Sequence, residues 1–215
     1  MPKYFNKFPT TFYNLTDNNT GVDVVTNITS KFSFEESFKN NTSVYYSYVI
    51  SDGDSPEIVA HKIYGDAEKH WIILAMNDIY DVVADWPMDQ PSWVNYMNKK
   101  YYDQADTSNT GISGTQWAQT HVHSFYKFIE QTIISTDKKH QTTIQIDENT
   151  YANTTETSTI YTLNDNSKVK IDVLKGLKTY YYYENELNES KRNIKIMKPE
   201  FVPQVEAEFK RVISL

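Results

Sequence analysis

The pattern of apolar and polar positions is most regular in residues 44–98. Residues 44–50 are β-branched and aromatic, which is typical of a strand. After an acidic turn, Ser55 and Pro56 predict a helix start, because serine caps helix N-termini and proline fits the first turn. Gly65 predicts its end, and apolar rows at four-residue spacing predict a second helix in 66–77. This segment therefore predicts a strand–helix–helix unit.

The chain before this unit keeps neither a helical nor a strand period. Residues 1–43 alternate aromatic rings with turn-forming residues, which indicates an extended arm that docks through its rings. Its expected anchors are Phe32, Phe34 and Phe38. Directly after the two helices, residues 80–91 are interrupted by proline and are expected to form a loop.

Residues 99–183 predict a β-rich middle region. Runs of β-branched and aromatic residues, separated by polar turns, are expected to form strands at 125–134, 142–146, 158–163, 169–173 and 179–183. Residues 103–115 are rich in Gly, Ser, Thr and Asn and predict a linker or exposed loop. Residues 103–175 contain no sequence motif that we can match to a known one.

The last segment, 184–215, changes character again. Residues 184–191 are charged and compatible with a helix, and 193–197 alternate so that Ile194 and Ile196 share one face of a short strand. Pro203 opens a final helix whose apolar stripe includes Val205 and Phe209, at i and i+4. That stripe fits a core helix and a partner-docking helix equally well. The overall prediction is an α+β chain of four segments: 1–43, 44–98, 99–183 and 184–215.

Composition favours a thin core. Only 39% of the 215 residues are hydrophobic, yet the chain has 17 Tyr, 10 Phe and 4 Trp. Large rings are favoured at interfaces, so much of this surface is expected to be buried by partners. The net charge of −7 argues against binding to duplex DNA or an anionic membrane, and no apolar run is long enough to cross a bilayer. The absence of cysteine excludes disulfides and thiol chemistry.

No constellation supports catalysis. Asp52 and Asp54 flank a glycine and could act as acid and base, but carboxylates before a helix are more often caps. His121 and His123 could form a metal pair if both lie on a strand, yet no third ligand is identifiable. Phosphate-binding and nucleophile motifs are also absent. We therefore expect no cofactor and no metal.

The strand–helix–helix unit resembles the LysM module. The matching residues are Gly53-Asp54-Ser55, the helix at 58–60, Tyr64-Gly65-Asp66, Trp71 and Asn77-Asp78-x-Tyr80. LysM is a small βααβ domain that in many proteins binds N-acetylglucosamine-containing glycans through the loops after its first strand and second helix. The resemblance implies a groove of Gly53, Asp54, Ser55, Asp78, Ile79 and Tyr80.

The tail resembles a baseplate wedge family of contractile-tailed bacteriophages, the wedge subunit fifty-three family. The similarity rests on Tyr183-Glu184, Asn188-Glu189-x-Lys191-Arg192, Ile194-Lys195-Ile196 and the final helix. The resemblance implies a structural virion protein, made in the host cytoplasm and present in six copies. It implies binding to other wedge subunits and to neighbouring wedges around the hub, with hub or sheath-initiating proteins as further candidates.

Partner docking is then expected in the arm and the tail. The expected docking residues are Phe5, Phe8, Phe12, Tyr13, Tyr181, Tyr183, Lys191, Arg192, Ile194, Ile196, Phe201, Val205 and Phe209. Two alternatives stay open at this point. One is a free peptidoglycan-binding LysM module. The other is a cell-wall hydrolase whose catalytic residues lie in 103–175, with Asp52, Asp54, His123 and Glu130 as the residues to test.

Overall fold

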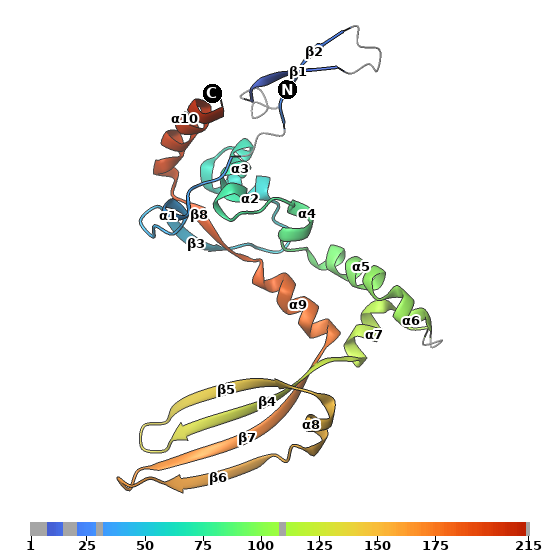
Figure 1. Ribbon diagram of the computed structural model, residues 1–215, viewed down its shortest axis with the longest axis vertical. Helices are drawn as coiled ribbons and strands as arrows, with labels where there is room; N and C mark the ends of the chain where they lie inside the picture. Colours follow the sequence, from blue (N-terminus) through green and yellow to red (C-terminus); the bar gives the residue numbers. More distant parts are fainter. Residues whose placement is uncertain (1–7, 15–20, 29–31, 108–110, 214–215) are drawn as a thin grey trace. The chain divides into compact units, whose positions relative to one another are not determined.

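The computed structural model describes residues 8–14, 21–28, 32–107 and 111–213. These residues form a mixed α+β structure with three separate antiparallel sheets (Figure 1). By internal contacts the chain divides into two compact units, residues 1–90 with 188–215 and residues 91–187. The division therefore joins the C-terminal segment to the first part of the chain.

The first unit begins with a hairpin and a short helix. Strands β1 (Thr10–Tyr13) and β2 (Asp23–Thr26) pair only with each other, and α1 (Glu36–Lys39) follows. Residues 1–43 therefore contain regular structure that the extended-arm prediction lacks. The three expected anchors, Phe32, Phe34 and Phe38, do pack against a buried cluster of this unit.

The predicted strand–helix–helix unit is present. Strand β3 (Tyr45–Val49) leads to α2 (Pro56–Tyr64), the short 3-10 helix η2 (Ala67–Lys69) and α3 (His70–Met76). Ser55 Oγ accepts a hydrogen bond from Ile58 N at 3.4 Å, and Gly65 ends α2 with a φ of 70°. Both roles agree with the sequence prediction, because they depend only on neighbouring residues.

The second strand of this unit comes from the other end of the chain. Strand β8 (Asn193–Met197) is antiparallel to β3, with Tyr46 opposite Ile196 and Tyr48 opposite Ile194. The 3-10 helix η3 (Pro199–Phe201) and α10 (Val202–Ile213) follow. The elements β3, α2, α3 and β8 thus form a strand–helix–helix–strand arrangement whose last strand is remote in sequence (Figure 1).

Two buried clusters hold this unit together. One contains Trp71 and Phe209, whose ring centroids are 4.5 Å apart, together with Phe8, Val44, Ile72, Met76, Met197, Val202 and Val205. The other contains Ile50, Val59, Ala60, Ile73, Trp86, Ile194 and Ile196. The apolar stripe of α10 is therefore a core stripe at Val205 and Phe209, while Val212 is 44% exposed.

The loop predicted at 80–91 is only partly a loop. Asp81 caps α4 (Val82–Asp85), with its Oδ1 accepting from Val83 N at 2.9 Å. Helix α5 (Gln90–Lys100) begins where the loop was expected to end. The only local signal for this four-residue helix is the capping aspartate, whereas the prolines at 87 and 91 favoured the interpretation as a loop.

The second unit begins with helices where the sequence predicts a linker. Helix α6 (Tyr102–Thr107) occupies the start of 103–115, and α7 (Gly114–Thr120) begins inside it. Ser113 and Gln116 form a capping box, a signal that the composition-based prediction overlooked. Residues 108–110 lie outside the described residues.

A four-stranded antiparallel sheet follows, in the order β5-β4-β7-β6 (Figure 1). Its strands are β4 (Val122–Ile133), β5 (Lys138–Ile146), β6 (Thr157–Thr162) and β7 (Lys168–Thr179), with α8 (Glu148–Asn153) between β5 and β6. Four of the five predicted strands are found here. The fifth, at 179–183, is wrong, because α9 (Tyr180–Ser190) begins at Tyr180.

The tyrosine run became a helix because its rings pack on different neighbours. Tyr180 contacts Trp117, Tyr181 contacts Trp93 edge-on, and Tyr183 stacks on His123 at 3.8 Å between centroids. Consecutive side chains point in several different directions on a helix, whereas on a strand they would alternate between two faces. Tertiary packing thus outweighs the β-propensity of tyrosine.

Candidate docking surfaces

The N-terminal hairpin exposes apolar side chains. Phe12 of β1 is 77% exposed and lies opposite Val24 of β2, which is 62% exposed, so the two share one face. Tyr13 is 58% exposed. A two-stranded hairpin is marginally stable by itself, so burial of this face by another surface would stabilise it. Phe12 and Tyr13 are therefore available for docking; Phe5, also expected to dock, lies outside the described residues.

The docking residues expected in the tail have several different environments. Ile194, Ile196, Val205 and Phe209 are buried in the core of their own unit, as is Phe8, whose ring lies 6.0 Å from that of Phe209. A side chain already buried by its own chain offers no area to a partner. We therefore leave these five out of the proposed docking surface.

The remaining tail candidates are held by internal contacts. Lys191 Nζ donates to Ala84 O, and Phe201 packs against the cluster of Phe209. Arg192 binds Glu189 at 2.8 Å and Asp52 at 3.0 Å. Partial burial alone would lower the pKa of Arg192, but these two carboxylates outweigh it and raise the pKa. Tyr181 and Tyr183 are half-buried through their contacts with Trp93 and His123.

The first loop of the LysM-like groove is occupied by contacts within the chain. Gly53 has a φ of 78°, and Ser55 is spent as the cap of α2. Asp54 forms an ion pair with Lys62 at 2.6 Å, which raises the pKa of that lysine. The indole Nε1 of Trp86 donates to Asp54 O at 2.7 Å. The polar groups of this loop therefore fix the fold rather than point at an open site.

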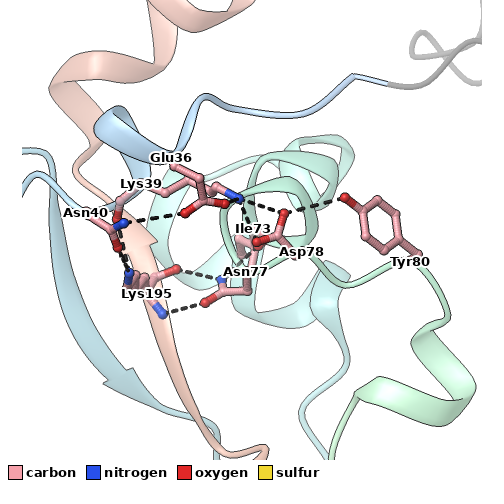
Figure 2. Close-up of polar contacts among 8 residues, drawn as sticks. All are labelled: Glu36, Lys39, Asn40, Ile73, Asn77, Asp78, Tyr80 and Lys195. Carbon is pink, nitrogen blue, oxygen red and sulfur yellow. Dashed lines mark hydrogen bonds and ion pairs between the residues drawn. The ribbon is translucent and has the colours of Figure 1, made fainter.

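The second loop is joined to α1 by a buried lysine (Figure 2). Lys39 is 5% exposed, and its Nζ lies 2.7 Å from Asp78 Oδ2 and 2.5 Å from Glu36 Oε1. The hydrogen bonds to Asp78 and Glu36 raise the pKa of Lys39. Asp78 has a φ of 54°, Ile79 packs against the core, and Tyr80 is 67% exposed. Of this loop only Tyr80 presents a large exposed ring.

A second link in Figure 2 joins the same loop to β8. The Asn77 side chain accepts from Lys195 N at 2.7 Å and donates to Lys195 O at 2.8 Å. Lys195 Nζ continues to Lys39 O at 3.1 Å and Asn40 Oδ1 at 3.0 Å. We call Lys39, Asn77, Asp78 and Lys195 the polar junction. It ties α1, the end of α3 and β8 into one unit.

The residues considered for catalysis or metal binding make structural contacts instead. Asp52 pairs with Arg192, and Glu130 pairs with Lys139 at 3.3 Å. His121 follows α7 and stacks on Trp117, while His123 lies at a bulge of β4. Within the described residues, no group of three potential metal ligands is found. In that same part of the chain, no helix combines the length and apolar character needed to cross a bilayer.

One surface was not found by sequence reasoning. In the sheet, Phe125 lies opposite Ile146 and Leu177, and Lys127 lies opposite Ile144 and Lys175. Alternate residues share a face, so the register defines what we call the apolar–basic face. Its aliphatic members are Ile129, Ile133, Ile144, Ile146, Val169, Ile171, Val173 and Leu177. The alternation was visible in the sequence, but the placement of these residues beside one another depends on the register of the strands.

The sequence was also compared with known proteins. The model of a family described as "Base plate wedge protein 53" matches residues 4–211, which include all of the second compact unit and most of the first. No curated protein matches the chain.

Proposed function

Because the chain belongs to the base plate wedge protein 53 family, we propose that it joins wedge subunits to one another and to neighbouring wedges around the central hub. The chain is a structural component of a phage baseplate wedge and not an enzyme. Six copies per baseplate form part of the proposal. In this proposal the chain presents several docking surfaces to its partners, each carried by a folded part of the structure.

The observation that carries the proposal is the exposed apolar hairpin. Phe12 and Val24 present adjacent apolar side chains on one face of β1–β2. Aromatic side chains supply large contact area at small entropy cost, which suits them to an interface. The hairpin begins close after Phe8, a ring buried in the core, so the docking element has an anchored base.

The strand–helix–helix–strand arrangement supports a LysM-like scaffold as part of the proposal. In it, β8 supplies the second strand of the βααβ order. We propose that this unit serves as a rigid support rather than a glycan site. Asp54 and Asp78 are paired with Lys62 and Lys39, so their carboxylates are already engaged inside the chain.

The test is incorporation of full-length variants into baseplates. The double substitution Phe12→Ser and Tyr13→Ser removes the exposed rings without touching a buried residue, and it is expected to reduce incorporation at least tenfold. Tyr80→Ser, at a similarly exposed ring in the LysM-like loop, is the matched control and is expected to incorporate normally. Normal incorporation of the double variant would contradict the docking role of the hairpin.

A further inference from the structure

The four-stranded sheet carries an apolar face with little cover. On the apolar–basic face, Ile144 is 42% exposed, Ile133 39% and Leu177 50%. Sheets normally bury such a face against a second layer. Helix α8 contacts β4 (Figure 1). Its Tyr151 ring lies 4.8 Å from the ring of Phe125, which belongs to this face.

The dimensions show how much of the face α8 leaves open. Helix α8 has 6 residues and is about 9 Å long at 1.5 Å per residue. Strands β4 and β7 have 12 residues each and extend about 40 Å at 3.3 Å per residue. Among the described residues, α8 therefore leaves about 30 Å along the strands uncovered. This length fits a helix of about 20 residues.

The charges on the face indicate the chemistry of what covers it. The strand residues on this face include Lys127, Lys138, Lys175 and His140 but no Asp or Glu. The acidic strand residues Glu130 and Asp172 lie on the opposite face. A partner with carboxylates beside an apolar surface would match this distribution, because opposite charges across an interface favour the correct partner and register.

Helix α8 shows how the face holds a helix. Lys175 Nζ lies 4.8 Å from the centroid of the Tyr151 ring and donates to Tyr151 O at 3.4 Å. A basic side chain of the sheet thus binds the helix while aromatic rings meet beside it. A longer helix could use Lys127 and Lys138 in the same manner.

We propose that the apolar–basic face binds an amphipathic helix of another baseplate protein, with Asp or Glu residues flanking its apolar stripe. The inference rests on the proposed structural role and names the kind of partner for this surface. A second copy of this chain is a poorer fit, since Val205 and Phe209 of its amphipathic helix α10 are buried in its own core.

Site-specific crosslinking in assembled baseplates tests the proposal. A photo-crosslinking phenylalanine analogue is placed at position 144, on the apolar–basic face, or at position 174. Leu174 is the matched control, because it is 46% exposed on the opposite face of the same sheet. Position 144 is expected to crosslink at least fivefold more, to a helical segment of another protein containing Asp or Glu.

The outcomes separate this inference from the proposed function. Failure of both labelled chains to enter baseplates would contradict the structural role itself. Normal entry with no excess crosslinking at 144, or crosslinking to a second copy or to a segment without acidic residues, would overturn only the inference.

The charge sign provides an independent readout. Ile144→Glu places an acid on the basic face and is expected to reduce incorporation at least tenfold relative to Ile144→Lys. Leu174→Glu, which adds the same charge to the opposite face, is expected to have little effect. Circular dichroism confirms that each variant is folded. Equal behaviour of the two Ile144 variants would contradict an acidic partner.

Discussion

Asn77 holds the backbone of Lys195 by two hydrogen bonds across a sequence separation of 118 residues, with Asn77 Oδ1 accepting at 2.7 Å and Asn77 Nδ2 donating at 2.8 Å. One side-chain amide thus satisfies both backbone groups of a residue in β8, much as a neighbouring strand would. Since β8 supplies Ile194 and Ile196 to the core, this contact fixes the C-terminal strand to the end of α3.

Asn77→Ala is expected to loosen β8. The substitution leaves the N–H and C=O of Lys195 without these partners, which costs about 1–3 kcal/mol for partly buried groups. Hydrogen exchange of the Lys195 amide measures the effect directly and should be faster by at least tenfold. Asn153→Ala, which removes an exposed side-chain bond in α8, is the control and should leave that amide unchanged.

Phe209→Ala separates a core role from a docking role for the last helix. Phe209 is fully buried, with its ring centroid 4.5 Å from that of Trp71 and 5.3 Å from that of Phe32. Truncating a buried phenylalanine lowers the free energy of unfolding by about 3–5 kcal/mol. Urea unfolding followed by tryptophan fluorescence measures this loss. Val212→Ala, at a 44% exposed position of the same helix, should change stability by no more than about 0.5 kcal/mol.

Gly114→Ala probes the packing of α7 against α5. A Cβ at Gly114 would lie 2.8 Å from Asn98 O and 2.9 Å from Met97 O, both backbone atoms that cannot rotate away. The overlap is expected to cost about 1–3 kcal/mol. Urea unfolding detects it, and Gly21→Ala is the control because no atom lies within 4 Å of a Cβ there. Equal stability of the two variants would show that α7 is not held this closely.

The parts of the fold that the sequence predicted are those set by neighbouring residues. Helix α2 begins after Ser55 and ends before Gly65, as expected. The alternation at 193–197 correctly predicted a strand with Ile194 and Ile196 on one face. What sequence reasoning could not supply was the partner of that strand. The pairing of β8 with β3 depends on contacts between opposite ends of the chain, which no local pattern specifies.

The candidate docking residues show the same limit. Phe12 and Phe209 are equally aromatic in the sequence, yet one is 77% exposed and the other fully buried. The buried lysine at position 39 was likewise invisible, because a lysine is normally exposed and its acceptor Asp78 lies far along the chain. The composition contains many aromatic and few aliphatic residues. Whether a given ring is buried by the chain's own core or by a partner is decided by tertiary packing.

Acid is expected to weaken the four-stranded sheet through Asp172. Hydrogen bonds from Lys170 and Ser158 lower the pKa of Asp172 below its ordinary value near 3.8. A carboxyl whose pKa is lower in the folded chain stabilises the fold above its unfolded pKa. That contribution is lost as the pH falls through the folded pKa. The stability difference between the natural chain and Asp172→Asn should therefore shrink between about pH 5 and pH 2. Urea unfolding across this range measures it.

Lys170→Met provides the complementary test for Asp172. Removing the ammonium group takes away the largest cause of the lowered pKa, so NMR titration should find the carboxyl pKa higher than in the natural chain. An unchanged pKa would assign the shift to the hydrogen bond from Ser158 and the charge of Lys139 instead.

We expect an asymmetry between Lys39 and Asp78, the ion-paired residues of the polar junction. Lys39 is 5% exposed, whereas the side chain of Asp78 is 47% exposed. Asp78→Asn leaves a buried cation with a single carboxylate partner, Glu36, that is itself largely exposed. Lys39→Met leaves an anion that water can solvate. Breaking a pair costs more when the remaining charge is buried, so Asp78→Asn should lower the urea midpoint more than Lys39→Met. Asparagine tolerates the positive φ of position 78, so backbone strain does not explain the difference. The reverse order would show that the ammonium group of Lys39, which contacts both Glu36 and Asp78, matters more to the junction than the burial of an unpaired cation.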